Sequence, residues 1–298
     1  MIQVENASMV FDKTFALKNV KCTIPDGCIY GLVGSNGAGK STFLRLLSGV
    51  YKPAGGTILF DGQPVFDNPD VKSQLVYVPD ELYFLPQATM KKMAKLYASV
   101  YPSFSFERFR ELTAMFKLNP NANIHTYSKG MKRQASTILA LSVRPKYLFF
   151  DETFDGLDPV IRNLVKTVLY NDVADRDSTV IITSHSLPEL EDTCDQLALL
   201  HKGGVVFESD IQNLKTSLFK VQIGLSVPFD QSKFSEIDFI NYTQKGSVAS
   251  FIVRGDREET QVKLQNLSPA LLDILPLSLE EVFIHEMDAL GYAFKDIL

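Results

Sequence analysis

Residues 34–41 read Gly-Ser-Asn-Gly-Ala-Gly-Lys-Ser, a run that fits the spacing GxxxxGK[ST]. Glycines at this spacing let the backbone turn so that several N–H groups point inward, and the dipole of a following helix adds positive charge there. Lys40 can then reach the β- and γ-phosphates of a nucleotide, and the Ser41 hydroxyl can bind Mg²⁺. The predicted phosphate contacts are Gly34, Ser35, Asn36, Gly37, Ala38, Gly39, Lys40, Ser41 and Thr42.

A strand and a helix are expected to hold this loop. Residues 29–33 are a short apolar run rich in strand-favouring side chains, and apolar residues recur at helical spacing over 43–47 until Gly49 offers a stop. The local pattern therefore predicts a strand, a glycine loop and a helix in that order.

A second candidate for chemistry follows the apolar run 147–150, which leads into Asp151 and Glu152. A strand that ends in a carboxylate beside a phosphate loop can hold Mg²⁺ with Asp151, and the next carboxylate can polarise water for attack on a γ-phosphate. Two acids at the end of a strand can also be purely structural. The presence of the phosphate loop at 34–41 favours the role in binding Mg²⁺ and polarising water.

The remaining patterning describes an α/β core followed by a smaller region. Apolar runs at 147–150 and 180–183 indicate buried parallel strands, with helices expected over 132–143 and 160–175. Earlier strands are expected at 2–10, 20–24, 28–33, 57–60 and 75–78, and a helical insertion, interrupted near Pro102, at 90–117. After about residue 211 we expect strands at 221–227 and 248–253 and helices at 257–267 and 279–289.

Composition excludes several classes of function. The 298 residues carry a net charge of -5, which argues against a nucleic-acid surface as the main partner. The first residues lack the basic head and apolar core of a secretory signal, and no apolar run is long enough to span a bilayer. Cys22, Cys28 and Cys194 have no metal-ligand spacing and suit buried thiols in a reducing cytoplasm.

Three further motifs identify a family. Residues 127–134 read Tyr-Ser-Lys-Gly-Met-Lys-Arg-Gln, residues 155–159 read Asp-Gly-Leu-Asp-Pro, and His185 follows Ile-Ile-Thr-Ser. With the loop at 34–41 and the carboxylates at 151–152, these resemble, in order and spacing across about residues 1–210, the ATP-binding subunit of ABC transporters: its signature, D-loop and switch histidine.

The resemblance implies roles for single residues. Glu152 would act as general base, His185 would clamp the γ-phosphate, and Asp155 of the D-loop would lie at the nucleotide. In a head-to-tail dimer, Ser128 and Gly130 would contact the γ-phosphate held by the second cassette. Phe11 lies where the family places an aromatic residue that stacks on adenine; it also reads as a core aromatic residue, and Phe15 is a competitor.

The sequence departs from the family at several positions. Lys129 and Met131 replace signature residues, and Thr153-Phe154 follow the carboxylates where Pro-Thr is usual. Asp80 and Glu81 stand where most members have a glutamine that contacts Mg²⁺. Either one of these acids, with Asp80 as the candidate metal ligand, takes that role, or both are solvated turn residues.

The expected fold is therefore α/β: a P-loop NTPase core of the ABC ATPase type with an antiparallel β subdomain and a helical subdomain at about 82–143. This domain would span 1–210, and a small α+β domain 211–298. Within the family, the residues of particular segments, 127–134 among them, resemble those of the bacterial ABC-2 exporter ATPases of Gram-positive antibiotic or bacteriocin response.

The expected function is ATP hydrolysis, with ATP and Mg²⁺, that powers export through a separate membrane permease. The expected partners are a second ATPase subunit, identical or different, and an integral membrane permease, with no nucleic acid. The expected location is the cytoplasmic face of the cell membrane, as a peripheral protein. Two alternatives remain: a soluble ABC ATPase that acts on ribosomes or DNA, and a nucleotide-binding regulator without hydrolysis.

Overall fold

The computed structural model describes residues 1–154, 156–289 and 291. The chain divides into two compact units, the first running from Met1 to Glu208 and the second beginning at Ser209. The first unit contains the phosphate loop and both carboxylates. Within the described residues, no helix is both long and apolar enough to span a membrane.

A six-stranded sheet forms the centre of the first unit, in the order β10-β9-β3-β8-β7-β6. The strands β3, β8 and β7 are buried at every residue, which explains their unbroken apolar sequences. Neighbouring strands from β9 to β6 pair in parallel, so their carboxyl ends lie at one edge of the sheet. The bounds are β3 Ile29–Val33, β6 Leu75–Val78, β7 Tyr147–Asp151, β8 Thr179–Ser184, β9 Gln196–His201 and β10 Gly204–Asp210.

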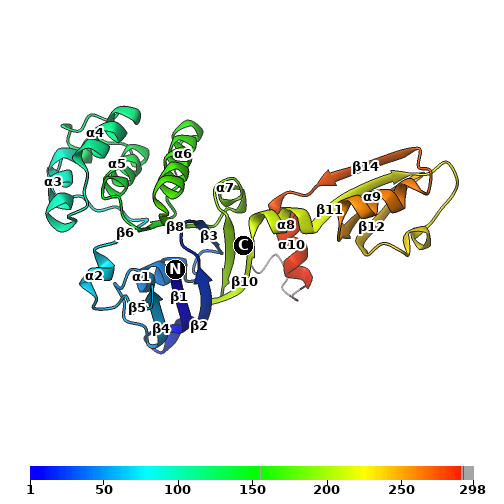
Figure 1. Cartoon of the computed structure of the whole chain (residues 1–298), viewed down its shortest axis with the longest axis horizontal. Helices are drawn as coiled ribbons and strands as arrows, with labels where there is room; N and C mark the ends of the chain where they lie inside the picture. The colour runs from blue at the N-terminus through cyan, green and yellow to red at the C-terminus, as the bar shows by residue number, and fades with distance from the viewer. Residues whose placement is uncertain (155, 290, 292–298) are drawn as a thin grey trace. The chain divides into compact units, whose positions relative to one another are not determined.

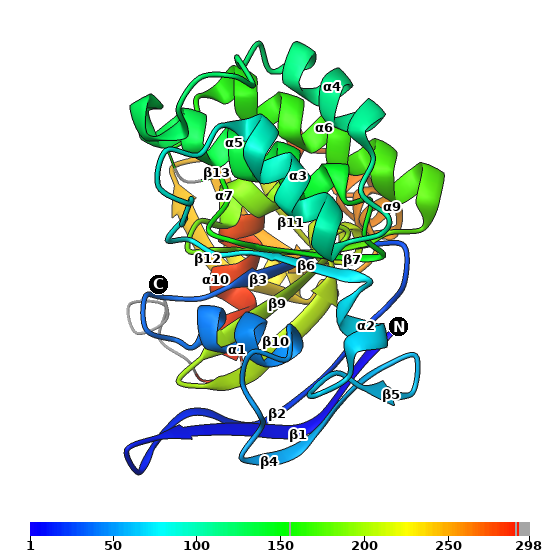
Figure 2. The ribbon, with the colours of Figure 1, turned by 90° about the vertical axis from the view of Figure 1, so that its left-hand side faces the viewer.

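A second, antiparallel sheet has the order β2-β1-β4-β5. Its strands are β1 Ile2–Phe11, β2 Thr14–Ile24, β4 Gly55–Phe60 and β5 Gln63–Pro64. Helix α1, Lys40–Leu47, lies between the two sheets (Figure 2) and buries four apolar side chains in a core that both sheets share. The helix that follows the phosphate loop is thereby fixed from two sides.

Helices cover the other face of the six-stranded sheet (Figure 1). They are α3 Met90–Val100, α4 Phe106–Met115, α5 Lys129–Ser142, α6 Pro159–Arg176 and α7 Leu187–Glu191. The unit also contains the short helix α2 Pro69–Lys72 and the 3₁₀ turn Ile124–Thr126. The expected α5 is confirmed, but it begins earlier, at Lys129, because the Ser128 hydroxyl accepts a hydrogen bond from the Met131 N–H and caps it. Helix α5 contacts α3, α4 and β6 and is buried from Arg133 to Ser142.

The second unit contains an antiparallel sheet of order β12-β13-β11-β14. Its elements are α8 Ile211–Ser217, β11 Leu218–Gly224, the 3₁₀ turn Gln231–Phe234, β12 Phe239–Lys245, β13 Val248–Arg254, α9 Arg257–Gln265, β14 Leu271–Pro276 and α10 Leu279–Ala289. The bounds expected for a strand at 221–227 are wrong, because β11 begins and ends three residues earlier. Its pairing with both neighbouring strands ends at Gly224. The strands β12 and β14 and the helix α8 were not expected.

Candidate functional site

The phosphate loop follows β3 and leads directly into α1. At Gly34 a Cβ atom would lie 2.3 Å from the Leu200 carbonyl oxygen, and at Gly39, where φ is 110°, it would lie 2.8 Å from the Ala16 carbonyl oxygen. Only glycine fits both places, so close packing against β2 and β9 sets the curve of the loop. No side chain caps α1 in the described structure, which leaves the N–H groups of its first turn to an anion.

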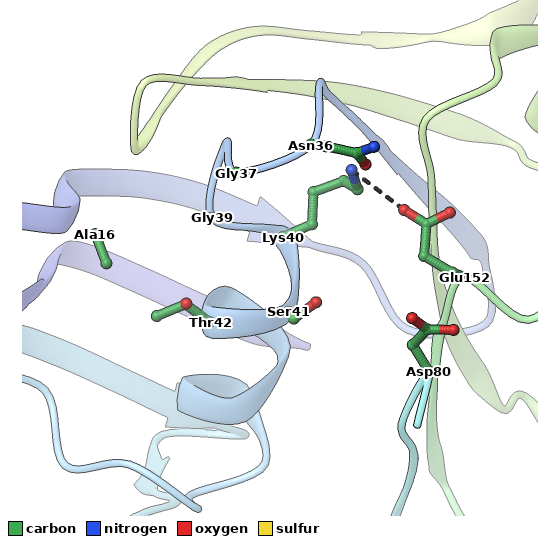
Figure 3. Close-up of a pocket in the computed structure, with 9 residues that line it drawn as sticks. All are labelled: Ala16, Asn36, Gly37, Gly39, Lys40, Ser41, Thr42, Asp80 and Glu152. Atoms are coloured by element: carbon green, nitrogen blue, oxygen red, sulfur yellow. Dashed lines mark ion pairs between the residues drawn. The ribbon is translucent and has the colours of Figure 1, made fainter. Parts of the chain in front are cut away.

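Lys40 is the first residue of α1, and its side chain is only 6% exposed. Its ammonium donates to the Gly34 carbonyl at 2.7 Å and to the Ser35 carbonyl at 3.3 Å. It also forms an ion pair with Glu152 Oε1 at 3.2 Å, drawn as a dashed line in Figure 3. The loop and the carboxylate after β7, which are far apart in the sequence, therefore meet at one cation.

Asp151 ends β7 and is 1% exposed. Two hydroxyl groups donate to its carboxylate: Thr183 Oγ1 to Oδ1 at 2.8 Å and Tyr77 to Oδ2 at 3.1 Å. Burial, with help from the Asp151 charge, raises the pKa of Tyr77, so its hydroxyl remains protonated and donates. Each carboxylate oxygen keeps a lone pair, so Asp151 fits a metal ion or a metal-bound water as a hard oxygen ligand.

Glu152 has a left-handed backbone, with φ of 50°, a strained conformation of the kind that clusters at functional sites. Its N–H donates to Thr183 Oγ1 at 3.0 Å. Its two carboxylate oxygens face different partners: Oε1 faces Lys40, and Oε2 lies 3.0 Å from His185 Nδ1. His185 follows β8 and is largely exposed. A chain from cation to carboxylate to imidazole thus crosses the ends of three neighbouring strands.

A cavity of about 260 Å³ opens at this place (Figure 3). Its wall combines backbone N–H groups, one ammonium, hydroxyl groups and carboxylates, which suits a polyphosphate accompanied by a hard cation. The lining residues are Ala16, Asn36, Gly37, Gly39, Lys40, Ser41, Thr42, Asp80 and Glu152. The structure therefore brings together the predicted loop, Glu152 and Asp80.

The signature residues stand at the start of α5 and are not part of this wall. Ser128 caps the helix, and its side chain is exposed. At Gly130 a Cβ atom would lie 3.1 Å from the Gly156 carbonyl oxygen, so the signature abuts the D-loop. Asp155, the predicted D-loop contact, lies outside the described residues.

Phe11 is not a core residue, because 41% of it is exposed. Its ring packs edge-on against Tyr51, with 5.5 Å between centroids. Phe15 is also exposed and has the Lys18 ammonium 5.8 Å from its ring centroid. Neither aromatic ring lines the cavity, and stacking of Phe11 on adenine stays a prediction.

Asp80 follows β6 after Pro79, and it is more than a solvated turn residue. Its carboxylate accepts a hydrogen bond from the Arg133 guanidinium of α5 at 2.5 Å while also lining the cavity. Glu81 is exposed and faces a neighbouring hollow with Lys129 and Lys132. No pattern in the sequence predicts the Arg133 contact. The only signal for Tyr77 and Thr183 is that each is a polar residue near the end of a strand.

Comparison with known proteins identifies the family of this chain. The family described as ABC transporter matches residues 17–155. The ABC transporter ATP-binding protein YtrB of Bacillus subtilis is 32% identical over 284 residues, which is 95% of this chain and 97% of the relative. The daunorubicin/doxorubicin resistance ATP-binding protein DrrA of Streptomyces peucetius is 30% identical over 73% of this chain and 67% of its own length.

Solved structures have the same fold. The ATP-binding subunit of an ABC transporter superposes with a TM-score of 0.66 at 25% identity, over 72% of this chain and 92% of that one. A dimeric bacterial ABC transporter cassette gives 0.65 at 22% identity, over 71% and 99%. The expected α/β fold of the P-loop NTPase type is thereby confirmed. The chain belongs to the family of ABC transporter ATP-binding proteins and is an ATPase.

Proposed function

We propose that this ATPase powers export through a separate membrane permease, and that ATP closes two cassettes head to tail. The chain would then work at the cytoplasmic face of the membrane as a peripheral subunit. Two similarities support the proposal: one relative is named for daunorubicin/doxorubicin resistance, and one similar cassette has a dimeric solved structure. The observation that carries its first step, ATP hydrolysis, is the contact of Lys40 with Glu152, and of Glu152 with His185.

Binding would begin with Lys40. Its ammonium contacts two loop carbonyls and Glu152, and a triphosphate, which carries more negative charge, would compete with them for it. A nucleotide in the cavity would take this ammonium and the open N–H groups of α1, and Glu152 would lose its cation. The carboxylate would then be available to a water molecule.

The residues present fit a magnesium ion. Ser41 and Asp151 would hold it, directly or through water, and Asp80 is the third candidate ligand. Ser41 and Asp80 line the cavity, whereas Asp151 is buried and is not among the lining residues. Bound there, the ion would neutralise charge that develops on the phosphate oxygens. Tyr77 and Thr183 would keep the Asp151 carboxylate fixed during the reaction.

Hydrolysis would rely on Glu152 and His185. Glu152 would accept a proton from the attacking water, and His185, held at 3.0 Å from its carboxylate, would contact the γ-phosphate. Ser128 and Gly130 would contact the nucleotide bound by the second cassette through the N-terminus of α5. Phe11 would stack on the adenine, and Asp155 would lie beside the composite site.

Two substitutions test this mechanism. Glu152→Gln keeps the size of the side chain but removes the base, so hydrolysis should stop while ATP binding persists and a dimer accumulates. Size-exclusion chromatography with ATP, beside an identically treated wild type, measures this. A mutant that stays monomeric contradicts head-to-tail closure.

Lys40→Ala should lose ATP hydrolysis and bind ATP more weakly. Undiminished turnover in the purified mutant contradicts the assignment of residues 34–41 as the phosphate loop.

The permease requires a separate test. The chain would be purified by affinity from detergent-solubilised native membranes, and the co-purifying proteins identified, with Lys40→Ala as the control for a nucleotide-dependent contact. An integral membrane protein in a fixed ratio supports the proposal. Recovery of ribosomal proteins or DNA instead favours the soluble ATPase, and export would then be rejected.

A further inference from the structure

Asp80 and Arg133 form an ion pair in which one side chain is buried and the other is exposed. The Arg133 side chain is 4% exposed, whereas that of Asp80 is 50% exposed, and the NH2 to Oδ1 distance is 2.5 Å. A guanidinium as deeply buried as this needs a charged or strongly polar acceptor, because removing it from water is costly. Asp80 supplies one such acceptor from a loop at the surface.

The pair joins two elements of the site. Arg133 lies early in α5, one turn after the Ser128 cap, on a helix that packs against β6. Asp80 lies just beyond the end of β6, on the loop that forms one wall of the cavity. The contact thus fixes the loop after β6 against the helix that begins with the signature.

Asp80 also raises an electrostatic problem. It lines the cavity with Lys40 and Ser41, so its carboxylate faces the place where the negative phosphates would lie. An unpaired carboxylate there would repel a nucleotide that arrives without magnesium. On its other side, Asp80 faces a second hollow, which is lined by Arg133, Lys129 and Lys132 together with Glu81 and Leu82.

We propose that Arg133 is a positioning residue of the nucleotide site, which neutralises Asp80 and holds its carboxylate toward α5, so that Asp80 lines the cavity without repelling the phosphates. This inference rests on the nucleotide binding proposed for the cavity. Arg133 would affect nucleotide binding through Asp80. Its positive charge would reduce the repulsion between the Asp80 carboxylate and the phosphates.

Binding of ADP to single and double variants, measured by calorimetry with EDTA, tests the proposal. Arg133→Met leaves Asp80 uncompensated and should weaken binding about three- to tenfold. Asp80→Asn removes the negative charge but keeps an oxygen that accepts from the guanidinium, and should tighten binding by a similar factor. The double variant should return close to the wild-type affinity. Lys132→Met, a matched loss of one cation from the same helix, should change the affinity less than about twofold.

The outcomes separate the proposal from its alternatives. Excess Mg²⁺ should shrink the differences, since the ion itself neutralises the phosphates. If Asp80→Asn leaves binding in EDTA unchanged, the Asp80 charge does not act on the nucleotide and the proposal is wrong, whatever the variant does with Mg²⁺. If Arg133→Met does not fold, Arg133→Gln, which loses the charge but keeps a hydrogen-bond donor for Asp80, takes its place; weaker binding supports the proposal, and unchanged binding overturns it. A wild type that binds no nucleotide at this cavity overturns the proposed function instead.

Discussion

Thr183 links the two acidic residues of the site through one hydroxyl group, which contacts the Asp151 carboxylate and the Glu152 backbone. The hydroxyl donates to Asp151 Oδ1 at 2.8 Å and accepts from the Glu152 N–H at 3.0 Å, and the residue is 1% exposed. Thr183→Val keeps the shape of the side chain and removes only this group. We therefore expect an effect on stability and on catalysis together.

The magnitude follows from the two contacts. Each buried group left without its partner costs about 1–3 kcal/mol, so Thr183→Val should destabilise the first unit by about 3 kcal/mol. Thr183→Ser keeps the hydroxyl and loses one buried methyl group, which costs about 1 kcal/mol. ATP hydrolysis should fall about 10- to 100-fold in the valine variant, as it does when a partner of a metal ligand is lost, and much less in the serine variant.

Urea unfolding followed by circular dichroism and steady-state phosphate release measure these effects. The comparison between valine and serine is the decisive one, because the valine variant keeps the shape of the side chain and loses the hydroxyl, whereas the serine variant keeps the hydroxyl and loses a methyl group. The reasoning is refuted if the two variants unfold at the same urea concentration and hydrolyse ATP at the same rate.

Three other substitutions or treatments test separate parts of the structure. Gly34→Ala would place a Cβ atom 2.3 Å from a carbonyl oxygen, so the loop must shift, and ATP affinity measured by calorimetry should fall at least about tenfold; an unchanged affinity would contradict the packing. Burial raises the pKa of Glu208, so its ionisation opposes folding; stability from this group is present at low pH and lost as pH rises through the raised pKa. Glu208→Gln should therefore gain stability relative to the wild type between about pH 4 and pH 8, and a gain confined to acid would have the wrong sign. Burial raises the pKa of Cys22 and Cys28 to about 12 and also raises that of Cys194, so a thiol reagent near pH 8 should label none of them until the protein unfolds, and rapid labelling of the native protein would refute their burial.

Much of the fold could be predicted from local sequence. The strand before Gly34 and the helix after it carry their own signals, namely a short apolar run and an apolar spacing of three and four residues. The buried strands β7 and β8 were equally plain. By contrast, β12 has exposed polar residues along most of its length and lies at a sheet edge, where only one neighbour contributes to its pairing, so its sequence pattern is weak.

Local signals also explain which site residues could be found in advance. The phosphate loop is a contiguous motif, and Asp151 and Glu152 follow a recognisable strand, so the sequence by itself determined the family, the ATPase activity and the candidate chemistry. Tyr77 and Thr183 became visible only when parallel pairing set β6 and β8 on either side of β7. That register is a property of the whole sheet and is not encoded in either strand alone.

The Asp80–Arg133 pair was decided by tertiary structure in the same way. The two residues are 53 positions apart, and nothing in either segment predicts their contact. They meet because α5 packs against β6, which brings a buried cation to the loop beyond that strand. The sequence thus determined which groups are available for chemistry, whereas the packing of helix on sheet determined which charges face one another, because electrostatic contact depends on distance in space and on exclusion of water.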